Sequence, residues 1–329
     1  MEYVLGVDGG NTKTIALVAR LDGTIVGAGR GGCGDIYGAR SATDALTAVE
    51  GAIDAALGAA GVSRAALRVG CFSMAGADWP EDFAFLHAAF LQRGLGRQVI
   101  VVNDAIGALR AGSPDGTGVV VVCGTGAAIG ARAADGRLWH SSFWQEPQGG
   151  RELGFKTLRA VYRAELGIDP PTMLTARVLA FFGQPSVEAM LHMFTAREGT
   201  PPDDVSGLAR VLLDTAQEGD ATARRIVRCH GAALGDYALA AARRVGIEAT
   251  PFTLVLAGGV LRHPSRLLRN AIVARVRRTA PGVRPVMSRF EPAVGALFLA
   301  LEAAGVPIDQ HLLARLAPTL PPPSLYTTA

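Results

Sequence analysis

The sequence is poor in cysteine, lysine and aromatic residues, and it has no long apolar run. Its four cysteines, at positions 33, 71, 123 and 229, form no CxxC pair, which argues against a zinc site or a disulfide framework. Aromatic residues make up only 6% of the chain, too few for a platform that stacks single-stranded nucleic acid. No stretch approaches the roughly 18 consecutive apolar residues of a membrane span. We therefore expect neither a nucleic-acid partner nor a membrane partner.

The chain is nevertheless long and apolar enough to bury sizeable cores. Its 329 residues are 49% hydrophobic and 19% charged, with a formal net charge of +3, which fits one large or two medium folded domains. The arginines are scattered, and their densest clusters lie on helical patterns that indicate solvated helix faces. The opening MEYVLGVDGG lacks the basic and apolar regions of a signal peptide. We expect a cytoplasmic protein.

A strand, a glycine turn and a second strand occur twice. Apolar runs at 3–7 and 14–19 flank the first turn, and runs at 119–123 and 128–133 flank the second. An Asp-Gly turn follows each pair, at 22–23 and at 135–136. This weak internal repeat predicts two related domains, each presenting a glycine turn to one cleft.

The first turn, DGGNTKT from Asp8 to Thr14, has the residue types of a phosphate-binding loop. Gly9 and Gly10 let backbone N–H groups approach an anion, the threonines add hydroxyl donors, and Lys13 adds charge. Asp8, at the strand end, is placed to hold water on a magnesium ion. The alternative is an ordinary hairpin with an aspartate turn, and the threonines and lysine favour phosphate binding.

Three further segments follow predicted strands and each has two interpretations. Gly124-Thr125-Gly126 is a second phosphate turn or a plain hairpin. Asp104 follows the strand at 99–102, where a carboxylate can accept a proton from a substrate hydroxyl, but it could instead be only the N-cap of the next helix. Gly258-Gly259 leaves room for a base or ribose, or serves close packing.

The order of these motifs resembles the actin/hexokinase/Hsp70-like ATPase fold. The set comprises DGGNTKT, an Asn-Asp pair after a strand, GTG, AGG and a late Gly-Ala helix at 291–296. Its details, including Met74 to Asp82, are similar to the BadF/BadG/BcrA/BcrD branch, which contains the N-acetylglucosamine kinases. The resemblance implies an α/β protein with a two-domain actin-like ATPase (ribonuclease H-like) fold and an interdomain cleft. It covers about residues 3 to 305.

The resemblance also implies residue roles, with ATP and Mg²⁺ as cofactors. Asp104 matches the catalytic aspartate, the general base for the acceptor hydroxyl, and Asp8 orients magnesium. Thr125 and Gly126 form the second phosphate loop, and Gly258 and Gly259 flank the adenosine. The remaining phosphate-binding positions are those of the first turn: Gly9, Gly10, Asn11, Thr12 and Lys13.

The acceptor-binding positions depart from the family pattern. Asp35 stands near the usual asparagine, Gly76 lies in the Gly-Ala-Asp turn, and Glu152 keeps an acid where the family has a Gly-Asp-Glu-Gly-Ser segment. Two acids would favour a cationic amino sugar, whereas Arg151 would favour a sugar with a carboxylate. We expect ATP-dependent phosphorylation of a hydroxyl group on an amino sugar, such as N-acetylglucosamine or glucosamine, by a homodimer.

Two alternatives stay open at this point. One is an ATPase that activates a 2-hydroxyacyl-CoA dehydratase or benzoyl-CoA reductase and bridges a [4Fe–4S] cluster, although Cys123 and Cys229 do not look like cluster ligands. The other is a non-catalytic sugar-sensing regulator on the same fold. The predicted domains are 1–115, the N-terminal ATPase domain; 116–292, the C-terminal ATPase domain; 293–310, a helix returning to the first domain; and 311–329, a C-terminal tail, which we expect to be extended from Pro318 onward.

Overall fold

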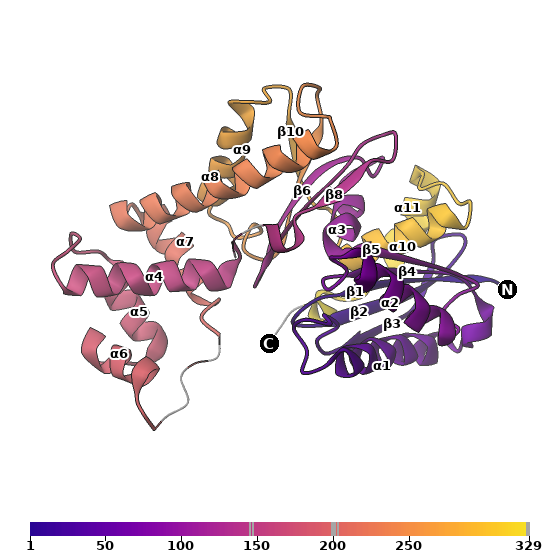
Figure 1. Cartoon of the computed structure of the whole chain (residues 1–329), viewed down its shortest axis with the longest axis horizontal. Coiled ribbons are helices and arrows are strands. Elements are labelled where there is room, and N and C mark those ends of the chain that lie inside the picture. Colours follow the sequence, from indigo (N-terminus) through magenta and orange to yellow (C-terminus); the bar gives the residue numbers. More distant parts are fainter. Residues whose placement is uncertain (145, 147, 199–201, 203, 327–329) are drawn as a thin grey trace. The chain divides into compact units, whose positions relative to one another are not determined.

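The computed structural model describes the chain except for residues 145, 147, 199–201, 203 and 327–329. It forms two compact units. Unit 1 comprises Met1–Val120, Gly130–Ser142 and Val286–Ala329, and unit 2 comprises Val121–Ile129 and Phe143–Pro285. Both combine strands with helices, as predicted for an α/β protein (Figure 1).

Unit 1 is built on a five-stranded sheet of order β3-β2-β1-β4-β5. The glycine turn joins β1 and β2 as an antiparallel pair, β2 pairs antiparallel with β3, and β4 lies parallel to both β1 and β5. The carboxyl ends of β1, β4 and β5 therefore meet at one edge. The strands are β1 Tyr3–Gly9, β2 Thr14–Arg20, β3 Ile25–Gly31, β4 Leu67–Met74 and β5 Gln98–Asn103.

Alternation along these strands sends apolar side chains to both faces of the sheet. Leu5 and Val7 lie in one core with side chains of α1 and α2, whereas Val4 and Ile15 lie in a second core with α10 and α11. Figure 1 shows α1 and α10 on opposite sides of the sheet. The helices of this unit are α1 Ala42–Ala60, α2 Pro80–Gln92, α3 Asp104–Gly112, α10 Pro292–Ala303 and α11 Gln310–Leu316.

The segment at 310–326 packs onto unit 1, and two short helical turns interrupt the extended conformation that was predicted from Pro318 onward. Short 3-10 helices form at Ala317–Thr319 and Pro323–Leu325. Leu320, Leu325 and Tyr326 pack against the second core, and the backbone N–H of Ile25 donates to the Thr319 hydroxyl at 3.0 Å. The prolines predicted an extended segment, but the partial burial of the neighbouring leucines holds it on unit 1.

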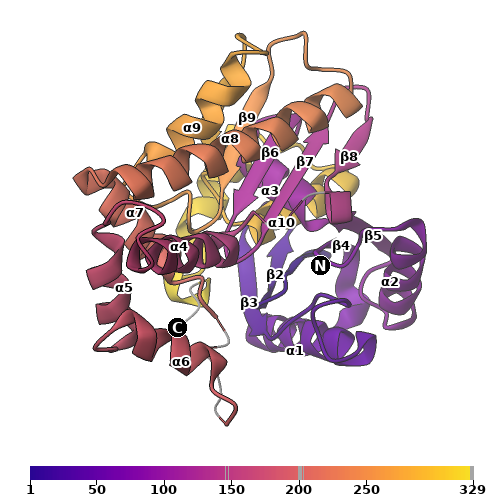
Figure 2. The ribbon, with the colours of Figure 1, turned by 60° about the vertical axis from the view of Figure 1, so that its left-hand side comes forward.

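A second five-stranded sheet has the order β10-β9-β6-β7-β8, and β7 pairs antiparallel with β8. Its strands are β6 Gly118–Cys123, β7 Ala127–Arg132, β8 Leu138–His140, β9 Thr253–Ala257 and β10 Arg284–Met287. In unit 2, α8 and α9 run side by side, and α4 packs on α7 (Figure 2). The helices are α4 Gly150–Glu165, α5 Leu174–Phe182, α6 Val187–Thr195, α7 Leu208–Glu218, α8 Ala221–Arg244 and α9 Leu267–Arg277. Among the described helices, none has the length and apolar character needed to cross a bilayer.

Candidate active site

The turn after β1 is held by backbone hydrogen bonds and by close packing. The N–H of Gly10 donates to the Lys13 carbonyl at 2.9 Å, and the N–H of Gly34 donates to the Gly10 carbonyl at 3.0 Å. A Cβ at Gly9 would lie 2.4 Å from the Met74 side chain, so glycine fits tightly there. Asn11 and Thr12 are exposed at the tip of the turn. The turn thus presents polar side chains and backbone to solvent while its base is fixed.

Asp8 lies at the end of β1 and keeps part of its surface open to solvent. Burial of its carboxyl raises its pKa to about 7, and the nearby carboxylates of Asp104 and Glu291 add to the rise, while Lys13 opposes it. A cation that binds beside this carboxyl would stabilise its ionised form. Glu291, at the start of α10, was not among the predicted site residues.

Asp104 opens α3 directly after β5, and it is not the N-cap of that helix. The side chain of Asn103 caps α3 instead, accepting from the Ala105 N–H at 3.1 Å. The interpretation of Asp104 as only a helix cap was therefore wrong, because its neighbour fills that position. Burial raises the pKa of Asp104 to about 7, and the negative charges of Asp78 and Asp35 raise it further.

Asp78 and Asp35 form the acidic surroundings of Asp104. The amide of Asn103 donates to the Asp78 carboxyl at 3.2 Å, and burial raises the pKa of Asp78 to about 6 although a hydrogen bond from Ser142 opposes this. Gly76 lies against Asp35, since a Cβ there would be 2.8 Å from Asp35 Oδ1. Unit 1 thus brings together Asp8, Asp35, Gly76 and Asp104, all predicted for the site, and adds Asp78.

The end of the chain reaches the same place. Lys13 Nζ donates to the Tyr326 carbonyl, and Arg30 donates to the Leu325 carbonyl at 3.1 Å. The phenol oxygen of Tyr326 is buried, with no hydrogen-bond partner among the described residues. Burial raises the pKa of this phenol above its usual range, and the carboxylates of Glu291 and Asp8 raise it further. No sequence motif pointed to this contact, which joins residues 313 positions apart.

Magnesium was predicted at Asp8, and the donors present fit it. Within the described part of the chain, no three His, Cys, Asp or Glu side chains are arranged as a complete metal site. Mg²⁺ in nucleotide sites keeps most of its waters and takes only one or two carboxylates beside the phosphates. Asp8 would supply one such carboxylate, with Asp104 nearby. Burial raises the pKa of both side chains, and a bound cation would favour their ionised forms.

In unit 2, the second glycine turn is bonded to the start of α4. The N–H of Gly150 donates to the Gly124 carbonyl at 2.8 Å, and the N–H of Arg151 donates to the Thr125 carbonyl at 3.1 Å. Neither Gly124 nor Gly126 has a left-handed φ, and an added Cβ at either would meet none of the described atoms within 4 Å. Packing and backbone conformation therefore do not explain these glycines, whereas close approach of a ligand would.

Gly258 and Gly259 follow β9, and the structure supports close packing for the first and ligand contact for the second. Gly258 has a φ of +97°, and a Cβ there would lie 2.3 Å from the Cys123 carbonyl, so packing explains it. Gly259 has neither constraint, because its added Cβ meets no described atom within 4 Å. Only Gly259 is left to face a ligand.

Glu152 lies in the first turn of α4, where its carboxylate is 3.6 Å from Lys156 Nζ. Arg151, the residue that would favour a carboxylate-bearing acceptor, places its guanidinium 5.9 Å from the centre of the Phe155 ring. Cys123 is buried, which raises the pKa of its thiol to about 12, whereas Cys229 is exposed on α8. A buried protonated thiol does not suit an iron–sulfur ligand, so the geometry gives the dehydratase-activator alternative no support.

The chain matches the model of the BadF/BadG/BcrA/BcrD ATPase family over residues 5–300. It belongs to this family. The resemblance identified from the sequence is thereby confirmed. A relative, the N-acetylmuramic acid/N-acetylglucosamine kinase of Clostridium acetobutylicum, is 26% identical over 304 residues, covering 91% of this chain and 98% of the relative.

Two solved structures establish the fold of this BadF/BadG/BcrA/BcrD family member. A Chromobacterium violaceum protein, provisionally named an N-acetylglucosamine kinase, superposes with a TM-score of 0.68 at 24% identity, covering 92% of this chain and 99% of that one. A ROK family glucokinase from Streptomyces griseus, solved with glucose and AMPPNP, gives a TM-score of 0.58 at 20% identity, covering 91% and 99%. The predicted two-domain actin-like ATPase fold is confirmed.

Proposed function

We propose that this protein is an ATP-dependent kinase that phosphorylates a hydroxyl group of an amino sugar. The observation that carries the proposal is the position of Asp104 at the carboxyl end of β5, with a pKa of about 7 and a neighbouring residue that caps the helix in its place. A general base is most effective when its pKa lies near the working pH. Curated relatives that are kinases of N-acetylated amino sugars support the same assignment.

Asp104 would accept the proton of the acceptor hydroxyl as that oxygen attacks the γ-phosphorus of ATP. The exposed first turn, with Lys13, and the open glycines at 124, 126 and 259 would bind the nucleotide. Asp8 would hold the water shell of Mg²⁺, which offsets the charge of the phosphates. Phosphoryl transfer needs chiefly this positioning and charge compensation.

The acceptor would lie against the acids of unit 1. Asp35 contacts Gly76, and Asp78 is coupled to Asp104, so hydroxyl and amino groups of a sugar would find acceptors there. Arg151 lies against the Phe155 ring and keeps its charge, and one relative is named a kinase of both N-acetylmuramic acid, which carries a carboxylate, and N-acetylglucosamine, so the proposal includes amino sugars with and without a carboxylate. The homodimer and the cytoplasmic location stay predictions.

The test is ADP release by the purified protein with glucosamine, N-acetylglucosamine, N-acetylmuramic acid and glucose as acceptors. We expect turnover with an amino or N-acetylamino sugar, and ³¹P NMR of the product would identify the phosphorylated oxygen. Nucleotide binding without turnover on any of these sugars would instead favour the sugar-sensing regulator.

The acceptor assignment has its own test in Asp35→Ala and Glu152→Ala. Each should raise the acceptor KM about ten- to hundredfold, because a charge-assisted hydrogen bond contributes about 1.5–3 kcal/mol. The KM for ATP should stay nearly unchanged. An acceptor KM like that of the wild type in both variants would place the sugar elsewhere.

A further inference from the structure

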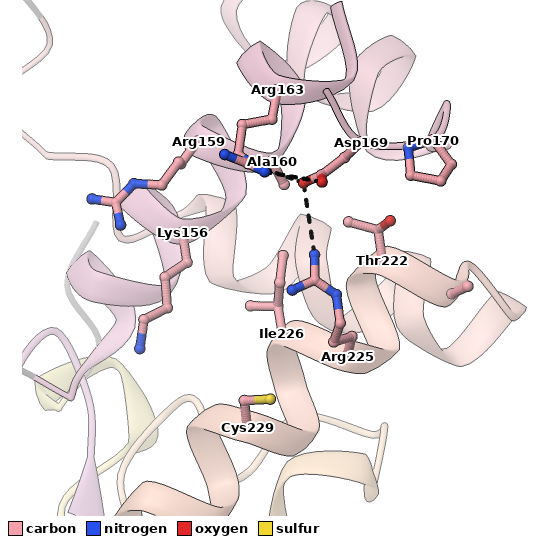
Figure 3. A pocket seen from close by; sticks show the side chains of 11 residues that line it. Lys156, Arg159, Ala160, Arg163, Asp169, Pro170, Thr222, Arg225, Ile226 and Cys229 are labelled. Atoms are coloured by element: carbon pink, nitrogen blue, oxygen red, sulfur yellow. Dashed lines mark hydrogen bonds and ion pairs between the residues drawn. The ribbon is translucent and has the colours of Figure 1, made fainter. Parts of the chain in front are cut away.

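Unit 2 contains a pocket that the proposed kinase reaction does not use. It has a volume of about 660 Å³ and lies between α4, α8 and the segment that contains Asp169 and Pro170 (Figure 3). This volume is within the range of about 300–1,000 Å³ that is typical of small-molecule sites. Its apolar lining comes from Ala160, Pro170 and Ile226, among others.

The charged lining of the pocket is strongly cationic. Lys156, Arg159 and Arg163 recur on α4 at the spacing that places side chains on one helix face, and Arg225 faces them from α8 (Figure 3). One acid accompanies these four cations. Asp169 is held by Arg163 through two hydrogen bonds of 2.8 and 3.1 Å and lies 3.9 Å from Arg225.

Part of the positive charge stays uncompensated, because Lys156 pairs with Glu152 at 3.6 Å and Arg163 pairs with Asp169, whereas the other two cations have no close acidic partner among the described residues. None of the described residues forms an ion pair with Arg159, and Arg225 makes only the long contact to Asp169. Lys156 donates to the imidazole of His230 at 3.2 Å, and burial followed by the charge of Lys156 lowers the pKa of His230 to about 4, so this partner is neutral.

We propose that the pocket binds a phosphorylated small molecule. Guanidinium groups bind phosphate through paired N–H donors, and Arg159 and Arg225 have such donors available from two helices. Lys156 adds a third cation and Thr222 a hydroxyl group. The apolar lining accommodates the carbon skeleton that a phosphate ester carries and a free inorganic anion lacks.

The pocket is also connected to the start of α4. Lys156 lies 3.6 Å from Glu152, and its partner His230 donates from Nε2 to the Gln148 carbonyl at 2.6 Å. Gln148 is two residues before Gly150, whose N–H donates to the turn at 124–126. An anion that attracts Lys156 would weaken its pairing with Glu152. This coupling depends on the proposed function, in which Glu152 binds the acceptor, and predicts a lower acceptor KM when the pocket is occupied.

Binding is tested without nucleotide, using Cys229, which is exposed and lines the pocket. Iodoacetamide labelling of Cys229, followed by peptide mass spectrometry, should slow at least tenfold with saturating glucosamine 6-phosphate and remain unchanged with glucosamine. Cys33 lies beside Asn11 and Asp35, so its labelling separately reports occupation of the proposed kinase site in unit 1. Inorganic phosphate and malonate are the further arms. Equal protection of Cys229 by malonate, or none by the phosphate ester, would overturn the proposal.

Variants make the same test independent of labelling. Arg159→Gln and Arg225→Gln should each weaken glucosamine 6-phosphate binding about tenfold in calorimetry, as loss of a charge-assisted hydrogen bond predicts. Arg228→Gln removes the same charge from an exposed position of α8 outside the lining, and its affinity should match the wild type. Equal losses in all three variants would mean that only general charge attraction is measured, and would overturn the site.

The coupling is then measured as the acceptor KM with and without the phosphate ester. We expect the KM to fall in the wild type and to stay constant in Arg159→Gln, whose basal turnover is retained. Binding without any KM change would reject the coupling but keep the site. Absence of turnover altogether would reject the proposed function and leave the binding result intact.

Discussion

The substitution Asp104→Asn should lower turnover and raise stability, because it removes an ionisable carboxyl. Asn has nearly the same shape but cannot accept the proton, so Asp104→Asn should lower kcat by ~10²–10⁴. The raised pKa of Asp104 makes the folded wild-type protein less stable when this carboxyl is ionised. The native carboxyl holds its proton up to about pH 7 whereas an unfolded one loses it near 3.8, so the wild type loses stability relative to the variant as pH rises between these values. Thermal unfolding at pH 5 and pH 8, without nucleotide or divalent cation, should show an increasing advantage of the variant. Near-normal turnover would remove Asp104 from catalysis.

The pH dependence of turnover belongs to the same residue. Because a general base acts in its ionised form, kcat/KM should increase with pH and level off above about 7, the pKa of Asp104. Asp8 titrates in the same range, so the profile should be steeper than that of one group. A profile that is flat between pH 5 and 8 would contradict the assignment.

At the scale of a turn, Gly258 and Gly259 predict opposite outcomes for the same substitution. Gly258→Ala meets the Cys123 carbonyl and a left-handed φ, so it should destabilise the fold by about 1–3 kcal/mol. Gly259→Ala has room and should unfold like the wild type, yet bind ATP more weakly. Denaturant unfolding and ATP titration separate the two. Unchanged ATP affinity in Gly259→Ala would move the nucleotide away from this turn.

Helix packing in unit 1 gives a second matched pair. A Cβ at Gly295 of α10 would lie 1.8 Å from the Gly107 carbonyl of α3, so Gly295→Ala should destabilise the protein by about 1–3 kcal/mol or more. Gly51 on α1 is exposed and open, and Gly51→Ala should stabilise it by up to about 1 kcal/mol. Equal melting temperatures for the two variants would contradict the close contact of α3 and α10.

For the whole molecule, local patterns predicted the elements and tertiary contacts decided the details. The apolar runs around both glycine turns predicted their strand pairs, and local chemistry also fixes the start of α1, where Ser41 accepts from the Asp44 N–H at 3.1 Å. The cap of α3 was ambiguous because Asn103 and Asp104 are both good caps. Glu291 and Tyr326 were not predicted, because only folding brings them near Asp8, which is more than 280 positions away in the sequence.

The paired acids at the ends of β1 and β5 have a consequence for calorimetry. Near pH 7, Asp8 and Asp104 are each only partly ionised, and a divalent cation binds the ionised form. Binding of Mg²⁺ should therefore release protons, which the buffer takes up with its own heat of ionisation. The apparent enthalpy measured in Tris should then differ from that measured in phosphate, and the difference should vanish at pH 9, where both carboxyls are already ionised. These two side chains would thus make metal binding visible as acidification of the solution.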